Sequence, residues 1–170
     1  TGLTIGGANA GNITIDNIVS GTDLANISGL VTFDAGGAGA AVDFSSNASS
    51  FNALTLTAQA GITLNQNLTT AGATIVDTDS DNDGAGDFTL TAAKTLTTGG
   101  NTLSITANDA IINGTATSGA ATTTILVSDG GVITLGGAGA GMSLSAAEIN
   151  AFTAGSLTIG DNTAGAITIA

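Results

Sequence analysis

The sequence predicts an all-β protein built as a parallel β-solenoid, with about three short strands in each coil. Three observations carry this prediction. Strand-like segments recur roughly every seven to ten residues along the whole chain. The chain contains 26 Gly and no Pro, a composition that favours regular strands separated by tight turns. Finally, stretches that lie far apart in the sequence repeat one another almost residue for residue.

Most of the strand-like segments alternate one aliphatic residue with one Thr, Ser or Asp. This alternation places the aliphatic side chains on one face of a strand and the polar side chains on the other, as a half-buried strand requires. The first two examples, residues 3–5 and 13–15, are separated by a turn rich in Gly and Asn. The same pattern predicts strand cores at residues 31–33, 42–44, 54–56, 62–64, 74–76, 88–90, 96, 103–105, 111–112, 125–127, 132–135, 142–144, 157–159 and 167–169.

An antiparallel sandwich or barrel is the alternative architecture with this strand spacing. A sandwich usually pairs dissimilar strands around a bulky core that includes aromatic residues, and this chain has only five Phe and no Trp or Tyr. A solenoid stacks similar short strands on one another, which explains the internal repeats and the Gly- and Asn-rich turns. The solenoid is therefore the preferred prediction.

The longest internal repeat joins the two ends of the chain. Residues 2–16 and 156–170 share seven residues at a constant offset of 154 (157 − 3), and a second repeat relates residues 36–44 to 136–144. The first repeat predicts that the end of the chain can occupy the same environment as its beginning. Either the coils continue covalently, or separate subunits stack end to end. The shared residues are Leu3, Ile5, Gly6, Ala10, Gly11, Ile13 and Ile15, which recur as Leu157, Ile159, Gly160, Ala164, Gly165, Ile167 and Ile169.

Composition narrows the function classes. Thirteen acidic residues against the single basic residue Lys94 give a net charge of −12. Because nucleic-acid binding and attraction to anionic membranes both need basic patches, neither is expected. The lack of His and Cys, together with one Lys, argues against nucleophilic triads and most proton shuttles, so we expect no enzyme. The charged partners that remain are cations, calcium first.

Residues 1–170 are expected to form a single solenoid segment, because the composition is uniform from end to end. No apolar run is long enough to cross a bilayer, so membrane insertion is not expected. The sequence starts at Thr1 without an initiator Met or a signal-like segment. We therefore expect an excerpt of a longer repetitive chain.

One segment departs from the β pattern. Ser145 and Glu148 have the spacing of a capping box, and the aliphatic residues between Leu144 and Phe152 are placed for a helical turn. The sequence predicts a short helix or a protruding loop here.

An acidic stretch is the one candidate site. Asp79, Asp81 and Asp83, followed by Gly84, match the first half of a calcium loop, in which alternate carboxylates converge on one hard cation. Leu90 stands where such loops carry a bidentate Glu, so a solvated acidic loop that binds nothing tightly is the alternative. The predicted calcium ligands are Asp77, Asp79, Asp81, Asp83 and Asp87.

Two further patterns are ambiguous. The Gly-rich stretches at 36–40 and 136–140 lack the Asp of calcium-binding nonapeptides and the adjoining helix of a dinucleotide loop, so we interpret them as solenoid corners. Thr-x-Thr occurs at 55/57, 89/91, 95/97, 115/117 and 122/124. If these Thr shared one flat face they would favour ice binding, whereas Thr is also a common outward-facing strand residue.

Residues 144–149, LSAAEI, followed by 153–160, TAGSLTIG, resemble a phrase that recurs in large filamentous-haemagglutinin-like exoproteins. The resemblance is specific over about the last thirty residues. It implies a right-handed parallel β-helix that serves as the shaft of an adhesin secreted with a partner outer-membrane transporter. It also implies a location outside the cell or on the bacterial surface, and a ligand on a host or neighbouring cell.

Together these observations predict a structural or adhesive shaft of an extracellular bacterial fibre, which stacks end to end and is stabilised by calcium at the acidic loop. The alternative is a ligand-binding solenoid, with ice or calcium-bridged glycans as its ligand.

Overall fold

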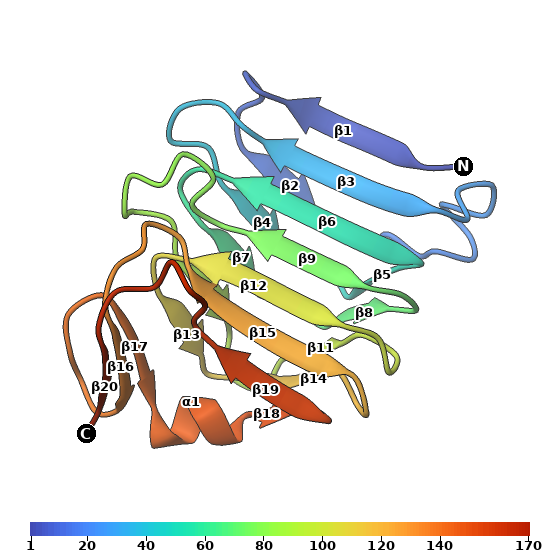
Figure 1. The fold of residues 1–170 in the computed structure, drawn as a ribbon. Helices are drawn as coiled ribbons and strands as arrows, with labels where there is room; N and C mark the ends of the chain where they lie inside the picture. Colours follow the sequence, from blue (N-terminus) through green and yellow to red (C-terminus); the bar gives the residue numbers. More distant parts are fainter.

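The computed structural model describes residues 1–170 as a solenoid whose chain runs repeatedly around three sheets of parallel strands (Figure 1). Sheet A has seven strands: β1 (Leu3–Gly7), β3 (Leu30–Ala35), β6 (Ala53–Ala58), β9 (Thr74–Asp77), β12 (Leu103–Ala107), β15 (Thr122–Val127) and β19 (Ser156–Ile159). Sheet B has five: β2 (Ile13–Ile15), β4 (Val42–Phe44), β7 (Ile62–Leu64), β10 (Phe88–Leu90) and β13 (Ala110–Ile112). Sheet C has β5 (Ser49–Phe51), β8 (Leu68–Thr70), β11 (Thr95–Thr97), β14 (Thr115–Thr117) and β18 (Phe152–Thr153). The predicted solenoid with three strands in each coil is confirmed.

The register between neighbouring coils explains the sequence spacing. In sheet A, Leu54 pairs with Thr74 and Leu103 with Thr123, so these two coils contain 20 residues each (74 − 54 and 123 − 103). The pairing of Thr74 with Leu103 spans 29 residues (103 − 74) because the acidic stretch is inserted into that coil. Insertions at corners therefore leave the strand register intact.

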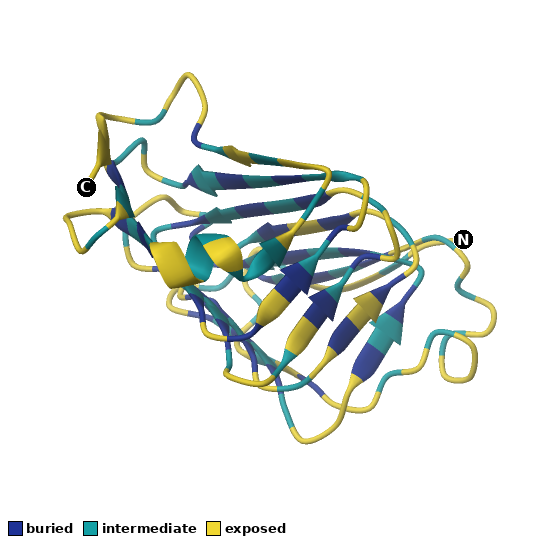
Figure 2. Ribbon diagram, turned by 90° about the horizontal axis from the view of Figure 1, so that it is seen from below, coloured by how far each residue is buried: buried dark blue, intermediate teal, exposed yellow.

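Alternating residues of each strand fill one continuous core. Burial alternates along the strands, visible in Figure 2 as changes of colour within each arrow, and 29 buried apolar residues form a single cluster. Like residues stack on like from coil to coil: Leu56 lies between Phe33 and Val76 in sheet A. Phe51 contacts Phe33 and Phe44 edge to face, with ring centroids 5.7 and 6.4 Å apart. The five Phe thus contribute to a core that is mainly aliphatic.

The corner between sheet C and sheet A is closed by a buried hydroxyl in three successive coils. Thr70 Oγ1 donates to the carbonyl of Gly72, and Ser118 Oγ donates to that of Ala121; Thr98 Oγ1 makes the corresponding bond to Asn101. Each of these three side chains is fully buried. Because a buried hydroxyl needs a partner, this bond satisfies both the side chain and a turn carbonyl. The hydroxyl therefore sets where the chain turns into sheet A.

The end of sheet B contains an irregularity that the sequence pattern did not predict. Strands β16 (Ile133–Gly136), β17 (Met142–Ser145) and β20 (Ile167–Ile169) form a separate parallel sheet in the order β17, β16, β20. Although β16 precedes β17 in the sequence, β17 is the strand that contacts β13. The segment between Gly137 and Gly141 therefore returns the chain to fill the position that β16 passed over.

This arrangement corrects the interpretation of the second Gly-rich stretch. Residues 36–40 form the expected corner, because they lie between β3 of sheet A and β4 of sheet B. Residues 136–140 instead connect two neighbouring strands of the same sheet, β16 and β17. The 100-residue repeat thus joins similar sequences in different positions of the fold.

Two carboxylates bridge the gap between β13 and β17. Asp109 Oδ1 accepts a hydrogen bond from the Ser143 N–H at 2.9 Å, and Glu148 Oε1 accepts one from the Ile112 N–H at 3.2 Å. Neither strand pairs with the other through its backbone. The two side chains therefore replace ladder hydrogen bonds where the sheet is interrupted.

The predicted helix is present as α1 (Ala146–Asn150), directly after β17. Ser145 Oγ accepts from the Glu148 N–H, and Glu148 Oε2 accepts from the Ser145 N–H, so the capping box is complete. Glu148 consequently has two functions, since its other oxygen holds Ile112 of β13.

Truncation of one stacked core residue tests this architecture. Leu56→Ala removes a fully buried side chain and is expected to lower the free energy of unfolding by about 2–5 kcal/mol. Thr55→Ala, on the outward side of the same strand, should change it by less than about 0.5 kcal/mol. Urea denaturation of both variants measures the difference, and equal effects would contradict the assigned strand faces.

The bridge at β13 predicts a pH effect. Burial raises the pKa of Asp109, with repulsion from Asp87 and Glu148 in the same direction, while N–H groups of Ser143 and Ala110 oppose the rise. The folded state then binds the proton more tightly than the unfolded state, so this carboxyl stabilises less as pH rises from the usual Asp pKa through the raised one. Asp109→Asn should make the loss of Tm over that window shallower.

Asp161→Asn is the opposite control. Hydrogen bonds from Thr163 lower the pKa of the exposed Asp161, so its stabilisation is lost as pH falls. The two variants should therefore change the slope of Tm against pH in opposite directions. A change of the same sign in both would contradict the assigned role of Asp109.

Candidate functional site

The acidic loop is an insertion at the corner between β9 and β10. Phe88 follows Thr74 by 14 residues, whereas Ile62 follows Leu54 by eight in the preceding coil, so the corner is six residues longer (14 − 8). The loop closes at its base, where Thr78 Oγ1 donates to the Gly86 carbonyl at 2.7 Å. A Cβ on Gly86 would lie 1.8 Å from the Thr78 carbonyl oxygen, so only Gly fits there.

Asp79 holds the loop from inside. Its side chain is fully buried, and Oδ1 accepts from the Asp83 N–H at 3.2 Å. Its Oδ2 accepts from the Gly84 N–H at 3.1 Å and from Ser128 Oγ at 2.5 Å. Ser128 follows β15, so Asp79 joins the loop to a coil two positions further along sheet A. This buried carboxylate is a structural element of the loop as well as a candidate ligand.

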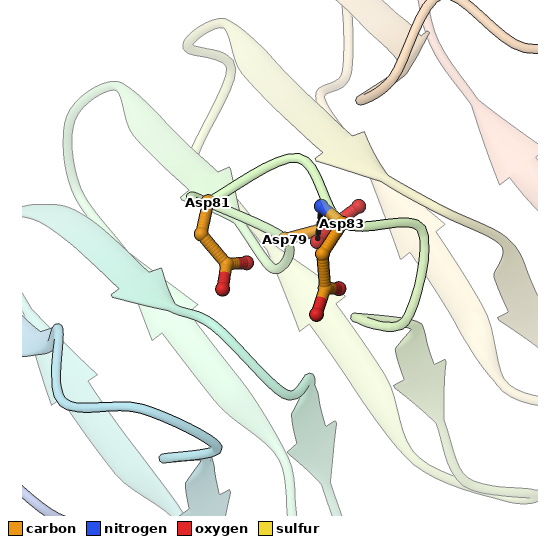
Figure 3. Close-up of side chains that lie close together, drawn as sticks. All are labelled: Asp79, Asp81 and Asp83. Atoms are coloured by element: carbon orange, nitrogen blue, oxygen red, sulfur yellow. Dashed lines mark hydrogen bonds between the residues drawn. The ribbon is translucent and has the colours of Figure 1, made fainter.

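The structure brings Asp81 and Asp83 to Asp79. One carboxylate oxygen from each of the three residues lies within 4.8 Å of the others, and Asp81 and Asp83 are exposed. Figure 3 shows the Asp79 side chain beside the backbone of Asp83, with the side chains of Asp81 and Asp83 extending from the same loop. These three residues, called the acidic triad below, could bind a metal ion.

The other two predicted ligands lie apart from the triad. Asp77 is in β9 and pairs with Thr57 and Thr106 in sheet A, and Asp87 precedes β10, where its Oδ1 accepts from Asn108 Nδ2. Neither belongs to the group whose carboxylate oxygens converge. The sequence spacing thus identified the triad, but it also included two residues that serve the strands on either side.

Asp77 is nevertheless electrostatically coupled to the triad. Burial is the main cause that raises its pKa, and repulsion from Asp79 adds to it, while the Asp79 N–H acts against it. Its Oδ1 is buried and has no hydrogen-bond partner. A buried carboxylate oxygen without a partner is unusual, and a cation near the loop would relieve its cost.

Sequence reasoning missed the groups that fix the loop. Ser128 is an isolated polar residue 49 positions from Asp79, and Gly84 approaches Asp129 and Asn108 of later coils. No local spacing rule relates these positions to an acidic run. A 20-residue coil period would have brought Asn108 and Ser128 into line with one another (128 − 108), and this was the available signal.

The Thr residues are distributed over all three sheets. In sheet A the outward row is Thr4, Thr32, Thr55, Ile75, Ser104, Thr124 and Thr158. In sheet C it is Ser50, Thr69, Thr97, Thr117 and Thr153. Sheet B adds Thr14, Thr63 and Thr89. Because no one face collects the Thr-x-Thr pairs, the distribution does not favour an ice-binding surface.

A shallow hollow of about 290 Å³ lies at the C-terminal end, between α1 and the ends of β16 and β20. Asn150 is the one polar side chain in its lining, and no carboxylate or Lys contributes. The remaining lining is small or aliphatic: Leu135, Gly136, Ala146, Ile149, Ile169 and Ala170. Its walls are therefore suited to apolar contacts.

In comparisons with known proteins, no family model matches this chain, and no curated protein or solved structure matches it. The single helix is far too short to cross a bilayer, and the chain has no helix that could do so.

Replacing Asp79 tests the structural part of the site. In Asp79→Asn the amide nitrogen cannot accept the bonds that one carboxylate oxygen now accepts, so a buried donor loses its partner. We expect the free energy of unfolding to fall by about 1–3 kcal/mol. The measurement is urea denaturation in chelator, with the exposed Asp81→Asn as a control of equal charge. Equal stability of the two variants would contradict the assigned role of Asp79.

Proposed function

We propose that this chain is a segment of the shaft of an extracellular bacterial fibre, with a structural or adhesive role. The observation that carries the proposal is the seven-stranded parallel sheet A, whose strands keep one register across every coil despite insertions at the corners. Such a molecule extends by adding coils, and each coil adds about 4.8 Å of length. A chain built in this way is suited to spanning distance.

The mechanism of a shaft is mechanical. Each coil contributes backbone hydrogen bonds in three sheets, and aliphatic side chains stack along the interior. Bending the rod would have to shear these ladders and open the stacked core together. The side-chain bridges from Asp109 and Glu148 preserve this continuity where the ladder of sheet B is interrupted.

The surface chemistry also suits this role. The outward rows contain mainly Thr and Ser, and the net charge of −12 keeps the shafts from associating laterally. The resemblance of residues 144–160 to filamentous-haemagglutinin-like exoproteins supports an extracellular or cell-surface location and a ligand on a host or neighbouring cell. Composition supports a non-enzymatic role, because the chain lacks His and Cys.

Calcium is the cation that we propose for the acidic triad. Asp79, Asp81 and Asp83 offer only carboxylate oxygens, the ligands that hard cations prefer, and exposed Asp81 and Asp83 leave room for water ligands. Bound calcium would offset the repulsion among the triad and Asp77. The loop would then be held both by Asp79 from within and by the ion from outside.

Calcium removal tests this part of the proposal. Calcium should raise the Tm of the wild-type chain relative to chelator, because a ligand that binds only the folded state stabilises it. Asp81→Asn/Asp83→Asn should lose most of that increase, whereas Asp34→Asn/Asp43→Asn, with equal charge change outside the loop, should retain it. Equal calcium responses in the two double variants would refute the site.

Force spectroscopy tests the shaft itself. With handles at the two ends of the chain, pulling along the solenoid axis should give high-force unfolding in discrete steps, since coils detach in turn. Asp109→Asn/Glu148→Gln should lower the force of the event that separates β17 from β13. Smooth extension at low force would contradict a load-bearing role.

A further inference from the structure

The two ends of the solenoid expose the inside of their last coils. Ile5 of β1 pairs with the buried Phe33 and so points inward, yet it is 41% exposed. At the other end, Ile167 and Ile169 of β20 pair with Ile133 and Leu135, and they are 50% and 83% exposed. These three residues are core residues by position that lack a covering coil.

The terminal strands of sheet A also have unpaired edges. Strands β1 and β19 each pair with one neighbour only, and neither contains a charged residue. Monomeric proteins usually protect such edges with Lys, Pro, bulges or an overlying segment. The chain has no Pro and its one Lys lies elsewhere, in the turn before β11, so sheet A lacks these protections at both ends.

The 154-residue repeat makes the two ends match. Leu3, Thr4 and Ile5 of β1 correspond to Leu157, Thr158 and Ile159 of β19, and both strands end sheet A. Gly6 and Gly160, which follow them, both have positive φ, +100° and +77°. The last coil therefore has the local shape that the first coil has.

Hydrogen-bond directions agree with pairing between these strands. In a parallel ladder, consecutive residues direct their N–H and C=O groups to opposite neighbours. The Gly160 N–H donates to the Ile125 carbonyl, so Leu157 and Ile159 direct their groups to the open edge of β19. Alternation back from the bond between Leu54 N–H and the Ala73 carbonyl, through β6 and β3, leaves Thr4 facing the open edge of β1.

We infer that a second copy of this chain docks its N-terminal end on the C-terminal end of the first, with β1 of one molecule paired in parallel to β19 of the other. Thr4 lies opposite Thr158, its N–H donates to the Leu157 carbonyl, and its carbonyl accepts from the Ile159 N–H. Leu3 then stacks on Leu157 and Ile5 on Ile159. The incoming coil also covers the exposed Ile167 and Ile169.

This contact continues an interface that the molecule already makes six times, between each strand of sheet A and the next. It joins two different surfaces, so each copy leaves one free end of each kind, and the assembly grows as an open filament. The inference deepens the proposed shaft function by naming its partner and register.

Two echo-equivalent variants test it. Ile5→Lys places a charge at the N-terminal end only, and Ile159→Lys places one at the C-terminal end only. Each should abolish concentration-dependent association seen for the wild type in sedimentation velocity with chelator present. An equimolar mixture should form dimers and nothing larger, because each variant retains one intact end and the two intact ends are complementary. Ile75→Lys, on the outward side of sheet A and 51% exposed, should associate as the wild type does.

The controls separate stacking from folding and from the shaft proposal. If Ile5→Lys does not fold, Thr4→Pro removes the edge donor without changing a core side chain and should also prevent association. Association of either single-end variant alone, or a monomeric wild type at all concentrations, would overturn the inference. A wild type that is monomeric but unfolds at high force would refute the stacking alone, whereas low-force extension would refute the shaft.

Discussion

The rest of the structure depends on the register between parallel strands of neighbouring coils. Because the side-chain period of a strand is two, a slip of one residue would turn every core side chain to the outside. In sheet A the register places Leu54, Leu56 and Ala58 beside inward residues of both neighbouring strands. Coil length, corner chemistry and the position of the acidic loop all follow from keeping this register.

The corners absorb the variation that the strands cannot. Buried hydroxyls at Thr70, Thr98 and Ser118 close one corner in three coils, and the acidic loop extends another corner without shifting β10. Where the ladder itself is broken, between β13 and β17, the carboxylates of Asp109 and Glu148 take over the N–H groups. Polar side chains thus preserve continuity wherever backbone pairing alone does not.

Much of this fold could be predicted from the sequence, because alternation and internal repeats are local signals. The strand cores, the capping box at Ser145 and Glu148, and the convergence of Asp79, Asp81 and Asp83 follow from spacing over a few residues. The return of β17 between β13 and β16 could not be predicted, since its sequence reads like any other strand. The Asp79–Ser128 bond was equally hidden, because the residues meet only after two further coils have formed.

The most direct test of the account is the distance between outward residues of one row in sheet A. The chain has no Cys, so spin labels can be placed on pairs of introduced Cys without competing thiols. Labels at Thr32 and Thr55, at Thr32 and Ser104, and at Thr32 and Thr124 are one, three and four strands apart. Label separations by electron paramagnetic resonance should increase by about 4.8 Å for each strand. Separations that do not increase in this order, as antiparallel pairing of the strands would give, would contradict the solenoid and everything inferred from it.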